Sequence, residues 1–237
     1  MEYRTVRLPA EGRWPADVEV WHVAMPPSEC DVDRSILDDA EIGRATLFRH
    51  SADRVRFMAT RGALRSLLGG RLGVQPAEVR FAVGRRGRPE LANASRKFSF
   101  NVSHSGEHAL ISISGIRTVG IDVERIDPTL DWKALVDLVC TDREARMLRA
   151  ESAALQREHF CRCWTAKEAL LKALGVGIAE DLRAFEVAPA GNGVQQPVVT
   201  GGGVFADAAA LRYCWLTDLS GYVGCVAFSG PAGLSIA

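Results

Sequence analysis

The chain has 237 residues, which is enough for one large domain or for two small domains with cores of their own. Apolar residues make up 47% of it and the formal net charge is zero, while no run of about 18 apolar residues is present, which excludes a transmembrane helix. The N-terminal sequence lacks the apolar segment of a secretory signal, and none of the six cysteines forms a C-x-x-C pair. We therefore expect a cytoplasmic protein with reduced thiols and no structural zinc site.

The zero net charge conceals two segments of opposite character. Residues 44–97 hold 13 arginines and lysines against three acidic residues, whereas residues 119–237 hold 15 acidic against 11 basic residues. The first segment is suited to contact phosphates, and the second carries candidate metal-binding acids.

The first half of the chain predicts a strand, two helices and a second strand. Alternation over residues 18–25 favours a strand, and acids early with arginines late favour a helix over 35–48. Apolar residues at helical spacing predict an amphipathic helix over 52–72. A short strand is expected over 78–83, followed by a turn rich in glycine and arginine at 84–89.

The centre of the sequence is its most informative part. An apolar run leads into a predicted polar turn at 103–106, which is followed by predicted strands over 109–114 and 119–124. Asp122 and Glu124 lie two residues apart on the second of these strands, so both carboxylates lie on one face. Two acids on one face repel each other unless a cation lies between them, and a hard divalent cation with oxygen ligands is the natural candidate.

The second half of the chain predicts three helices and then strands. The helices are expected over residues 131–140, 141–149 and 156–174, and the strands over 182–187, 196–205, 211–218 and 222–228. Because each half places helices before strands, we expect an α+β fold of two similar lobes, residues 1–117 and 118–237.

The longest predicted helix of this half carries a second cluster of polar side chains. Trp164, Glu168 and Lys172 are four residues apart and therefore lie on one face of the helix. An acid and a base thus project together beside a large aromatic ring. Taken alone, this pattern is also that of an ordinary surface ion pair.

Four ordered motifs together show a resemblance that none of them carries alone. Gly-Ile-Asp-Val-Glu at 120–124 is followed by Trp-Thr-Ala-Lys-Glu-Ala-Leu-Leu-Lys at 164–172, and both are preceded by Gly-Arg-Pro at 87–89 and Asn-Val-Ser-His-Ser at 101–105. In this order the motifs resemble those of the Sfp-type 4′-phosphopantetheinyl transferases, over residues 41–177.

The resemblance implies an enzyme that moves the 4′-phosphopantetheine group of coenzyme A onto a serine of an apo acyl or peptidyl carrier protein and releases 3′,5′-ADP. It implies that Asp122, Glu124 and Glu168 hold Mg²⁺ on the pyrophosphate. Lys172 would bind phosphate and stabilise the leaving oxygen, and Glu168 would accept the proton of the carrier serine. Asp122 would complete the catalytic set.

The resemblance also implies a set of contacts with coenzyme A. Ser103 and His104 would meet its phosphates, and Arg44 and Arg88 would meet the 3′-phosphate and the adenine end. The complete set of implied coenzyme-binding residues is Arg44, Gly87, Arg88, Pro89, Ser103, His104, Asp122, Glu168 and Lys172.

Other polar residues have plainer explanations. Four arginines are expected to be solvated surface charges: Arg54, Arg65, Arg85 and Arg86. Glu144 follows Thr141 by three residues, so it is either the acid of a helix capping box or a further partner of the metal or of a water. Two departures from the family pattern, Arg88 for its lysine and His108 for an aromatic residue, leave the metal acids untouched.

The resemblance implies a monomeric protein whose two lobes are related by a pseudo-twofold axis, with the active site in the cleft between them. The carrier protein should dock on an apolar surface with some basic residues. Neither nucleic acid nor membrane is an expected partner. Whether the carrier serves fatty-acid, polyketide or nonribosomal-peptide synthesis stays open at this point.

Three other functions fit part of the pattern. The same acids and arginines would serve another Mg²⁺-dependent phosphotransfer or pyrophosphate-cleaving enzyme, although the absence of G-x-x-x-x-G-K-[ST] excludes a P-loop kinase. A nucleic-acid-binding module would use the arginines of residues 44–97, but these are interleaved with core leucines. The third is a non-catalytic carrier-binding relative, against which the intact Asp122, Glu124, Glu168 and Lys172 argue.

Overall fold

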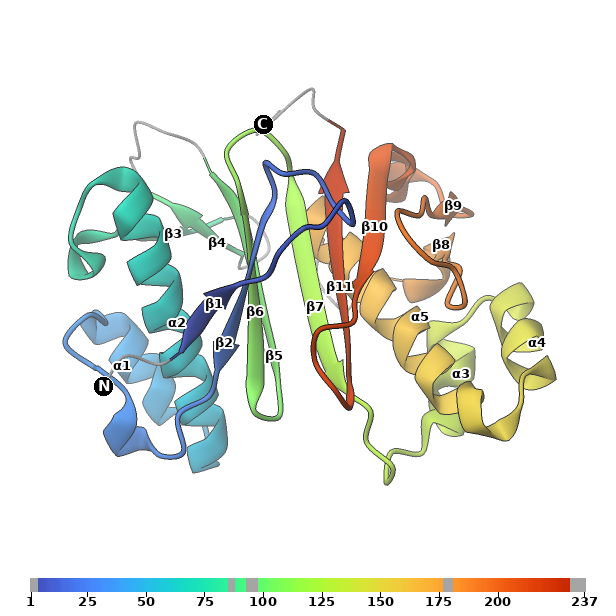
Figure 1. Ribbon diagram of the computed structural model, residues 1–237, viewed down its shortest axis with the longest axis horizontal. Helices are drawn as coiled ribbons and strands as arrows, with labels where there is room; N and C mark the ends of the chain where they lie inside the picture. Colours follow the sequence, from blue (N-terminus) through green and yellow to red (C-terminus); the bar gives the residue numbers. More distant parts are fainter. Residues whose placement is uncertain (1–3, 85–87, 93–97, 177–180, 231–237) are drawn as a thin grey trace.

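Two α+β lobes lie side by side in the computed structural model, which describes residues 4–84, 88–92, 98–176 and 181–230 (Figure 1). Each lobe consists of an antiparallel sheet with a long helix against it, and the two sheets meet at the centre of the molecule. This is the α+β fold of two lobes that the sequence predicts.

The first lobe is built on a four-stranded sheet with the strand order β1–β2–β6–β5. Its strands are β1 (Thr5–Arg7), β2 (Glu19–Ala24), β5 (Ser99–Ser105) and β6 (His108–Ser114), and a separate hairpin is formed by β3 (Phe81–Val83) and β4 (Pro89–Leu91). The helices α1 (Asp39–Thr46) and α2 (Ser51–Leu72) lie on the outer side of this sheet (Figure 1).

Local sequence signals set the ends of these helices. The side chain of Asp38 accepts a hydrogen bond from the backbone of Glu41 and the side chain of Glu41 accepts one from the backbone of Asp38, a capping box that starts α1. Gly73, in the left-handed conformation with a φ of 71°, ends α2. Arg65 of α2 is fully buried and donates to both acids of this capping box, so the expectation of a solvated charge is wrong for Arg65.

The second lobe is built on a three-stranded sheet with the strand order β10–β11–β7. Its strands are β7 (Val119–Arg125), β10 (Leu211–Leu216) and β11 (Tyr222–Ser229), and a short pair is formed by β8 (Phe185–Glu186) and β9 (Val198–Val199). The long helix α5 (Ala153–Leu174) lies against this sheet, and α3 (Trp132–Val139) and α4 (Asp142–Ala150) pack on α5 (Figure 1).

The lobes are joined where β5 and β7, strands of different sheets, run side by side. Alternate residues of β5 accept hydrogen bonds from backbone N–H groups of β7: Ser99 Oγ from Val119 (3.0 Å), Asn101 Oδ1 from Ile121 (3.0 Å) and Ser105 Oγ from Arg125 (3.1 Å). The spacing of two is that of one strand face. The alternating serines and asparagine of β5 therefore fix the position of this strand relative to β7.

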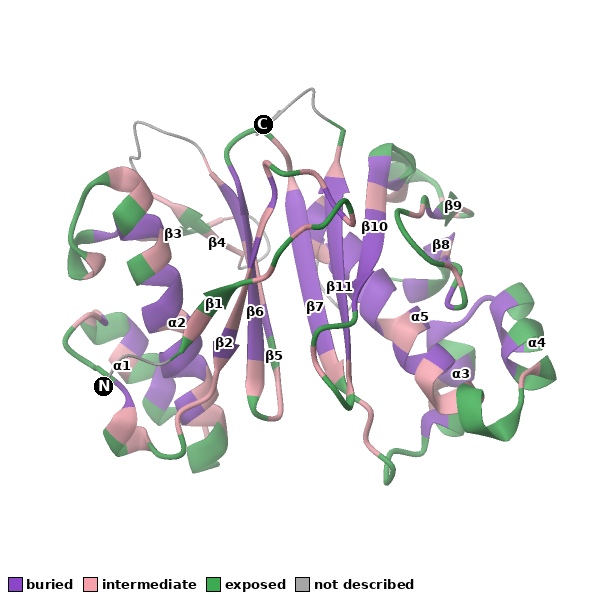
Figure 2. Ribbon diagram, in the orientation of Figure 1, coloured by how far each residue is buried: buried purple, intermediate pink, exposed green. Residues whose placement is uncertain are grey.

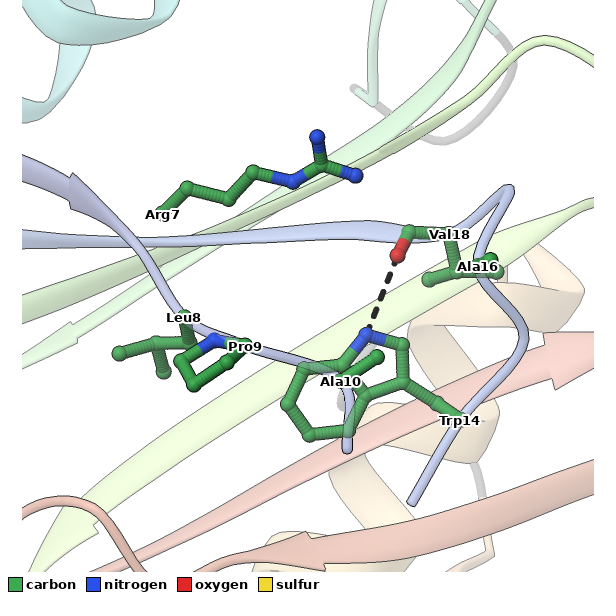
Figure 3. Close-up of a pocket in the computed structure, with 7 residues that line it drawn as sticks. All are labelled: Arg7, Leu8, Pro9, Ala10, Trp14, Ala16 and Val18. Carbon is green, nitrogen blue, oxygen red and sulfur yellow. Dashed lines mark hydrogen bonds between the residues drawn. The ribbon is translucent and has the colours of Figure 1, made fainter. Parts of the chain in front are cut away.

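The segment between β1 and β2 ties the lobes a second time. Both strands belong to the first sheet, but Trp14 and Val18 between them pack against apolar side chains of β7, β10 and β11. The indole nitrogen of Trp14 donates to the carbonyl of Val18 at 3.1 Å, beside a hollow of about 240 Å³ (Figure 3). Burial is accordingly concentrated on the central strands and on the sides of α2 and α5 that face them (Figure 2).

Two of the differences between the predicted elements and the structure concern the predicted polar turn and a glycine-rich segment. Residues 103–105 were expected in a turn but extend β5, and the turn contains Gly106, whose φ of 55° is left-handed. The predicted strand 196–205 is replaced by the short β9 and a 3-10 helix, Gly203–Ala210, because three glycines at 201–203 interrupt it.

Candidate active site

The close approach of α5 to β7 brings the two acid-bearing motifs together. At Gly120 a Cβ atom would lie 2.1 Å from the carbonyl oxygen of Ala169, so glycine is required where the helix crosses the strand. Glu168 and Lys172 flank this crossing on α5, and Asp122 lies two residues beyond it on β7. Side chains 50 positions apart in the sequence thereby become neighbours.

A partly buried ion pair joins the two motifs. Lys172 Nζ donates to Asp122 Oδ1 at 2.6 Å, and Ser103 Oγ donates to the same oxygen at 2.7 Å. Lys172 Nζ also donates to Ser103 Oγ at 3.2 Å. Since the three residues come from α5, β7 and β5, the cluster lies where the two lobes meet.

Three buried carboxylate oxygens of this cluster lack a hydrogen-bond partner among the described residues, namely Asp122 Oδ2 and both Oε atoms of Glu168. Burial, and then the charge of Asp122, raise the pKa of Glu168 to about 7. The same two causes raise the pKa of Glu124 to about 7, although Ser105 Oγ donates to its Oε2 at 3.0 Å. The site is therefore short of positive charge.

The chemistry of these carboxylates fits Mg²⁺. This ion takes oxygen ligands, commonly a few carboxylates together with substrate phosphates and water. An added cation would satisfy the unpartnered oxygens and offset the repulsion between the acids. In the part of the chain that the structure describes, no three acidic, cysteine or histidine side chains are already gathered in a metal-binding arrangement. The fit therefore rests on the donor set of Asp122, Glu124 and Glu168.

Ser103 and His104 lie on opposite faces of β5. Ser103 is buried against Asp122, whereas the side chain of His104 lies near Arg56 and Asp53 of α2. The residues packed around the ring, and then the charge of Arg56, lower the pKa of His104, although this residue stays exposed to solvent. Arg56 pairs with Asp53 and donates to a backbone carbonyl of the β5–β6 turn at 3.3 Å. The motifs found His104 but missed Arg56, whose only sequence signal is its place on an arginine-rich helix.

The remaining residues expected at coenzyme A differ in their surroundings. Arg44 is exposed at the end of α1, with its guanidinium carbon 5.3 Å from the ring centre of Phe57. The guanidinium of Arg88 instead lies inside the molecule and donates to three backbone carbonyls. Pro89 begins β4. Gly87 lies outside the described residues, as do Arg85 and Arg86.

Glu144 has a structural position in the second lobe. Its carboxylate accepts from the backbone N–H groups of Thr141 at 2.8 Å and Val187 at 2.7 Å, and from Lys167 Nζ at 2.6 Å. Glu144 and Lys167 are both buried, and Thr141 caps α4 in return. The capping-box interpretation of Glu144 is confirmed, and the first lysine of the helix motif is a core residue.

Comparison with known proteins matches both lobes to one family. Residues 118–223 match the 4′-phosphopantetheinyl transferase superfamily, and residues 21–115 match the N-terminal region of 4′-phosphopantetheinyl transferase. The 4′-phosphopantetheinyl transferase HetI of Nostoc sp. is 39% identical over 176 residues, which cover 73% of this chain and 74% of HetI. A putative 4′-phosphopantetheinyl transferase of Synechocystis sp. is 33% identical over 161 residues, 65% of each chain.

A solved structure of the holo-[acyl-carrier-protein] synthase of Thermotoga maritima aligns with a TM-score of 0.38 and 20% identity, covering 48% of this chain and 64% of the synthase.

The chain belongs to the 4′-phosphopantetheinyl transferase superfamily and is a transferase. The relationship inferred from the ordered motifs is confirmed at this level, and the narrower Sfp-type assignment stays a prediction.

Proposed function

We propose that this protein transfers the 4′-phosphopantetheine group of coenzyme A to a serine of an apo carrier protein and releases 3′,5′-ADP. The serine oxygen would bond to the phosphorus that carries pantetheine, and the bond from that phosphorus to the bridging pyrophosphate oxygen would break. The observation that carries the proposal is the crossing of α5 over β7, which gathers Asp122, Glu168 and Lys172 where the lobes meet.

Asp122, Glu124 and Glu168 are the proposed ligands of Mg²⁺. When bound, the ion would offset negative charge on the pyrophosphate. The proposal is supported by the unpartnered oxygens of Asp122 and Glu168 and by the raised pKa values of Glu124 and Glu168. Without a cation, three acids at one place would repel a pyrophosphate.

Glu168 is the proposed acceptor of the serine proton. Bound Mg²⁺ would lower the pKa of Glu168 from the value of about 7 that burial and the charge of Asp122 give it, so the carboxylate would be charged and would take the proton directly or through a water. Lys172 is the proposed electrostatic partner of the bridging oxygen, on which charge develops as the bond breaks. Ser103 holds Asp122 in place beside Glu168 and Lys172, through its hydrogen bond of 2.7 Å to Asp122.

The phosphates of coenzyme A are proposed to contact His104, Arg56 and Arg44. His104 and Arg56 lie together beside the β5–β6 turn. Arg44 is exposed, and none of the ion pairs found within the described residues involves it. Arginine suits this task because its planar fork binds two phosphate oxygens at once. Arg56 is an addition to the residues suggested by the motifs.

The carrier protein is proposed to dock beside the first turns of α5. Leu138 of α3 and Met147 of α4 are large apolar side chains with 62% and 48% of their surface exposed. Arg143, Arg146 and Arg149 of α4 are exposed as well, and two of them pair with acids, Arg143 with Glu186 and Arg149 with Asp137. An apolar surface with basic residues complements an acidic carrier.

A cytoplasmic monomer is the proposed state of the protein. Both lobes of one chain contribute to the cluster around Asp122, so a second copy is not needed to complete it. All six cysteines are free thiols, as expected of a reducing compartment. No helix in the described part of the chain is long and apolar enough to cross a membrane.

The test is to incubate the protein with coenzyme A, Mg²⁺ and several apo carrier proteins, and to measure the mass of each carrier. We expect one carrier to gain a phosphopantetheine group and EDTA to abolish the gain. If no carrier gains mass, the proposed function is wrong. Turnover that persists after complete removal of divalent cations would contradict the Mg²⁺ assignment alone.

A further inference from the structure

The side chain of Arg88 enters the junction between the two lobes. Nη1 donates to the carbonyl of Lys172 at 2.6 Å, and Nη2 donates to the carbonyls of Phe100 at 2.7 Å and Val119 at 3.1 Å. A longer contact of 3.4 Å joins Nη2 to Ser99 Oγ. One guanidinium thus bonds to α5, β5 and β7 together.

These three elements are the ones that carry the site. Phe100 precedes Ser103 by three positions on β5, and Val119 precedes Asp122 by three positions on β7. On α5 the bonded carbonyl is that of Lys172 itself. The backbone that Arg88 holds is therefore the backbone from which the cluster of Ser103, Asp122 and Lys172 projects.

The geometry of a guanidinium suits this arrangement, whereas that of an ammonium does not. A guanidinium presents five donors in a rigid plane, so it reaches acceptors that lie apart from one another. The three donors of a lysine all belong to one nitrogen atom, so they cannot reach carbonyls of three different elements. The positive charge also lies at the last turn of α5, where the helix dipole favours it.

We propose that Arg88 is a positioning residue, which aligns Lys172 with Asp122 at the junction of the two lobes, rather than a contact of the coenzyme phosphates. Its two terminal nitrogens are already bonded to protein carbonyls, so little of the fork is left for a phosphate. This inference rests on the proposed function, which wild-type turnover tests separately.

The two roles predict different results for the conservative substitution. A lysine keeps the point charge of a phosphate contact, although it loses the bidentate fork, whereas it keeps nothing of the three-way contact with backbone carbonyls. We expect both Arg88→Lys and Arg88→Ala to lower kcat by about tenfold or more, with the KM for coenzyme A changed by less than about threefold. The exposed Arg80, changed to alanine, is the matched control and should leave both parameters unchanged.

A second measurement compares coenzyme A with 3′-dephospho-coenzyme A as the donor. We expect the Arg88 variants to keep the wild-type ratio of kcat/KM for the two donors, because Arg88 does not read the 3′-phosphate. Near-normal kcat in Arg88→Lys, or a lost preference for coenzyme A in either variant, would overturn the proposal.

If the variants do not fold, a measurement on the wild-type protein tests the role of Arg88. NMR of its arginine side chains should show Arg88 guanidinium protons that exchange slowly without ligand and shift little when 3′,5′-ADP is added. Protons that become protected only on addition of 3′,5′-ADP would show a phosphate contact and overturn the positioning role.

Discussion

Replacing Gly120 with alanine tests whether the contact between α5 and β7 builds the active site. The new Cβ would lie 2.1 Å from the carbonyl oxygen of Ala169 and 2.5 Å from the amide nitrogen of Ala173, whereas ordinary contact begins at 3.4 Å. Both atoms belong to the backbone of α5, so no side-chain rotation relieves the clash. The helix would have to move away from the strand by about 1 Å or more.

The expected cost follows from two opposing effects. Overpacking of a core costs about 1–3 kcal/mol, and a clash with helix backbone belongs at the upper end. The lower entropy of the unfolded chain returns at most about 1 kcal/mol. We expect a net loss of about 2 kcal/mol, which for a chain of this size lowers Tm by about 4–8 °C.

Turnover should fall further than stability, because Glu168 and Lys172 move with α5 away from Asp122. Thermal unfolding and carrier loading at a temperature where Gly120→Ala is folded measure the two effects separately. Gly70→Ala is the control, since Gly70 lies exposed on α2 with nothing within 4 Å of its added Cβ, and it should gain about 0.5–1 kcal/mol. A Gly120→Ala protein with wild-type Tm and turnover would refute the reasoning.

Three further results are expected. Asp122→Asn should lower kcat by about 100-fold or more with an unchanged far-UV circular dichroism spectrum, because it removes the negative charge of a proposed metal ligand, and near-normal kcat would contradict that assignment. Glu144→Gln should lower the free energy of unfolding by about 3 kcal/mol in urea titrations, since it leaves the buried Lys167 without its counter-charge, while kcat per folded molecule stays within about twofold of wild type. Without divalent ions, stability should fall as the pH rises from about 4.5 to about 7, because the raised pKa values of Glu124 and Glu168 make the folded state bind more protons than the unfolded state over that window. Mg²⁺ should therefore raise Tm more at pH 8 than at pH 6, and an equal rise at both pH values would speak against binding by these carboxylates.

Strand and helix periodicity correctly predicted which acids and bases share a face. Asp122 and Glu124 do lie on one face of β7, and Glu168 and Lys172 do lie on one side of α5. Periodicity did not reveal what covers each face. The resemblance implies that Ser103 and His104 both contact phosphates, whereas on β5 their side chains lie on opposite faces of the strand.

The arginines show the same division more sharply. Arg65, Arg56 and Arg88 look alike in the sequence, each in a basic segment between residues 44 and 97. Only the fold places Arg65 in the core on two acids, Arg56 at a hairpin turn and Arg88 between the lobes. Apart from the pair of Arg56 with Asp53, three positions away, their partners are separated from them by between 11 and 84 positions, and contacts at such distances leave no local pattern.

The sequence by itself determined the family and the acid-bearing motifs, because these depend on residue types at fixed local spacing. It also determined where α2 ends and where α4 begins, because caps and glycine stops act within one helical turn, whereas the first helix, expected over residues 35–48, spans only Asp39–Thr46. Only the tertiary structure decided that Gly120 lets α5 reach β7 and that Lys172 meets Asp122 there. Such contacts join segments 50 positions apart, and they exist only once α5 has packed on the sheet of the second lobe.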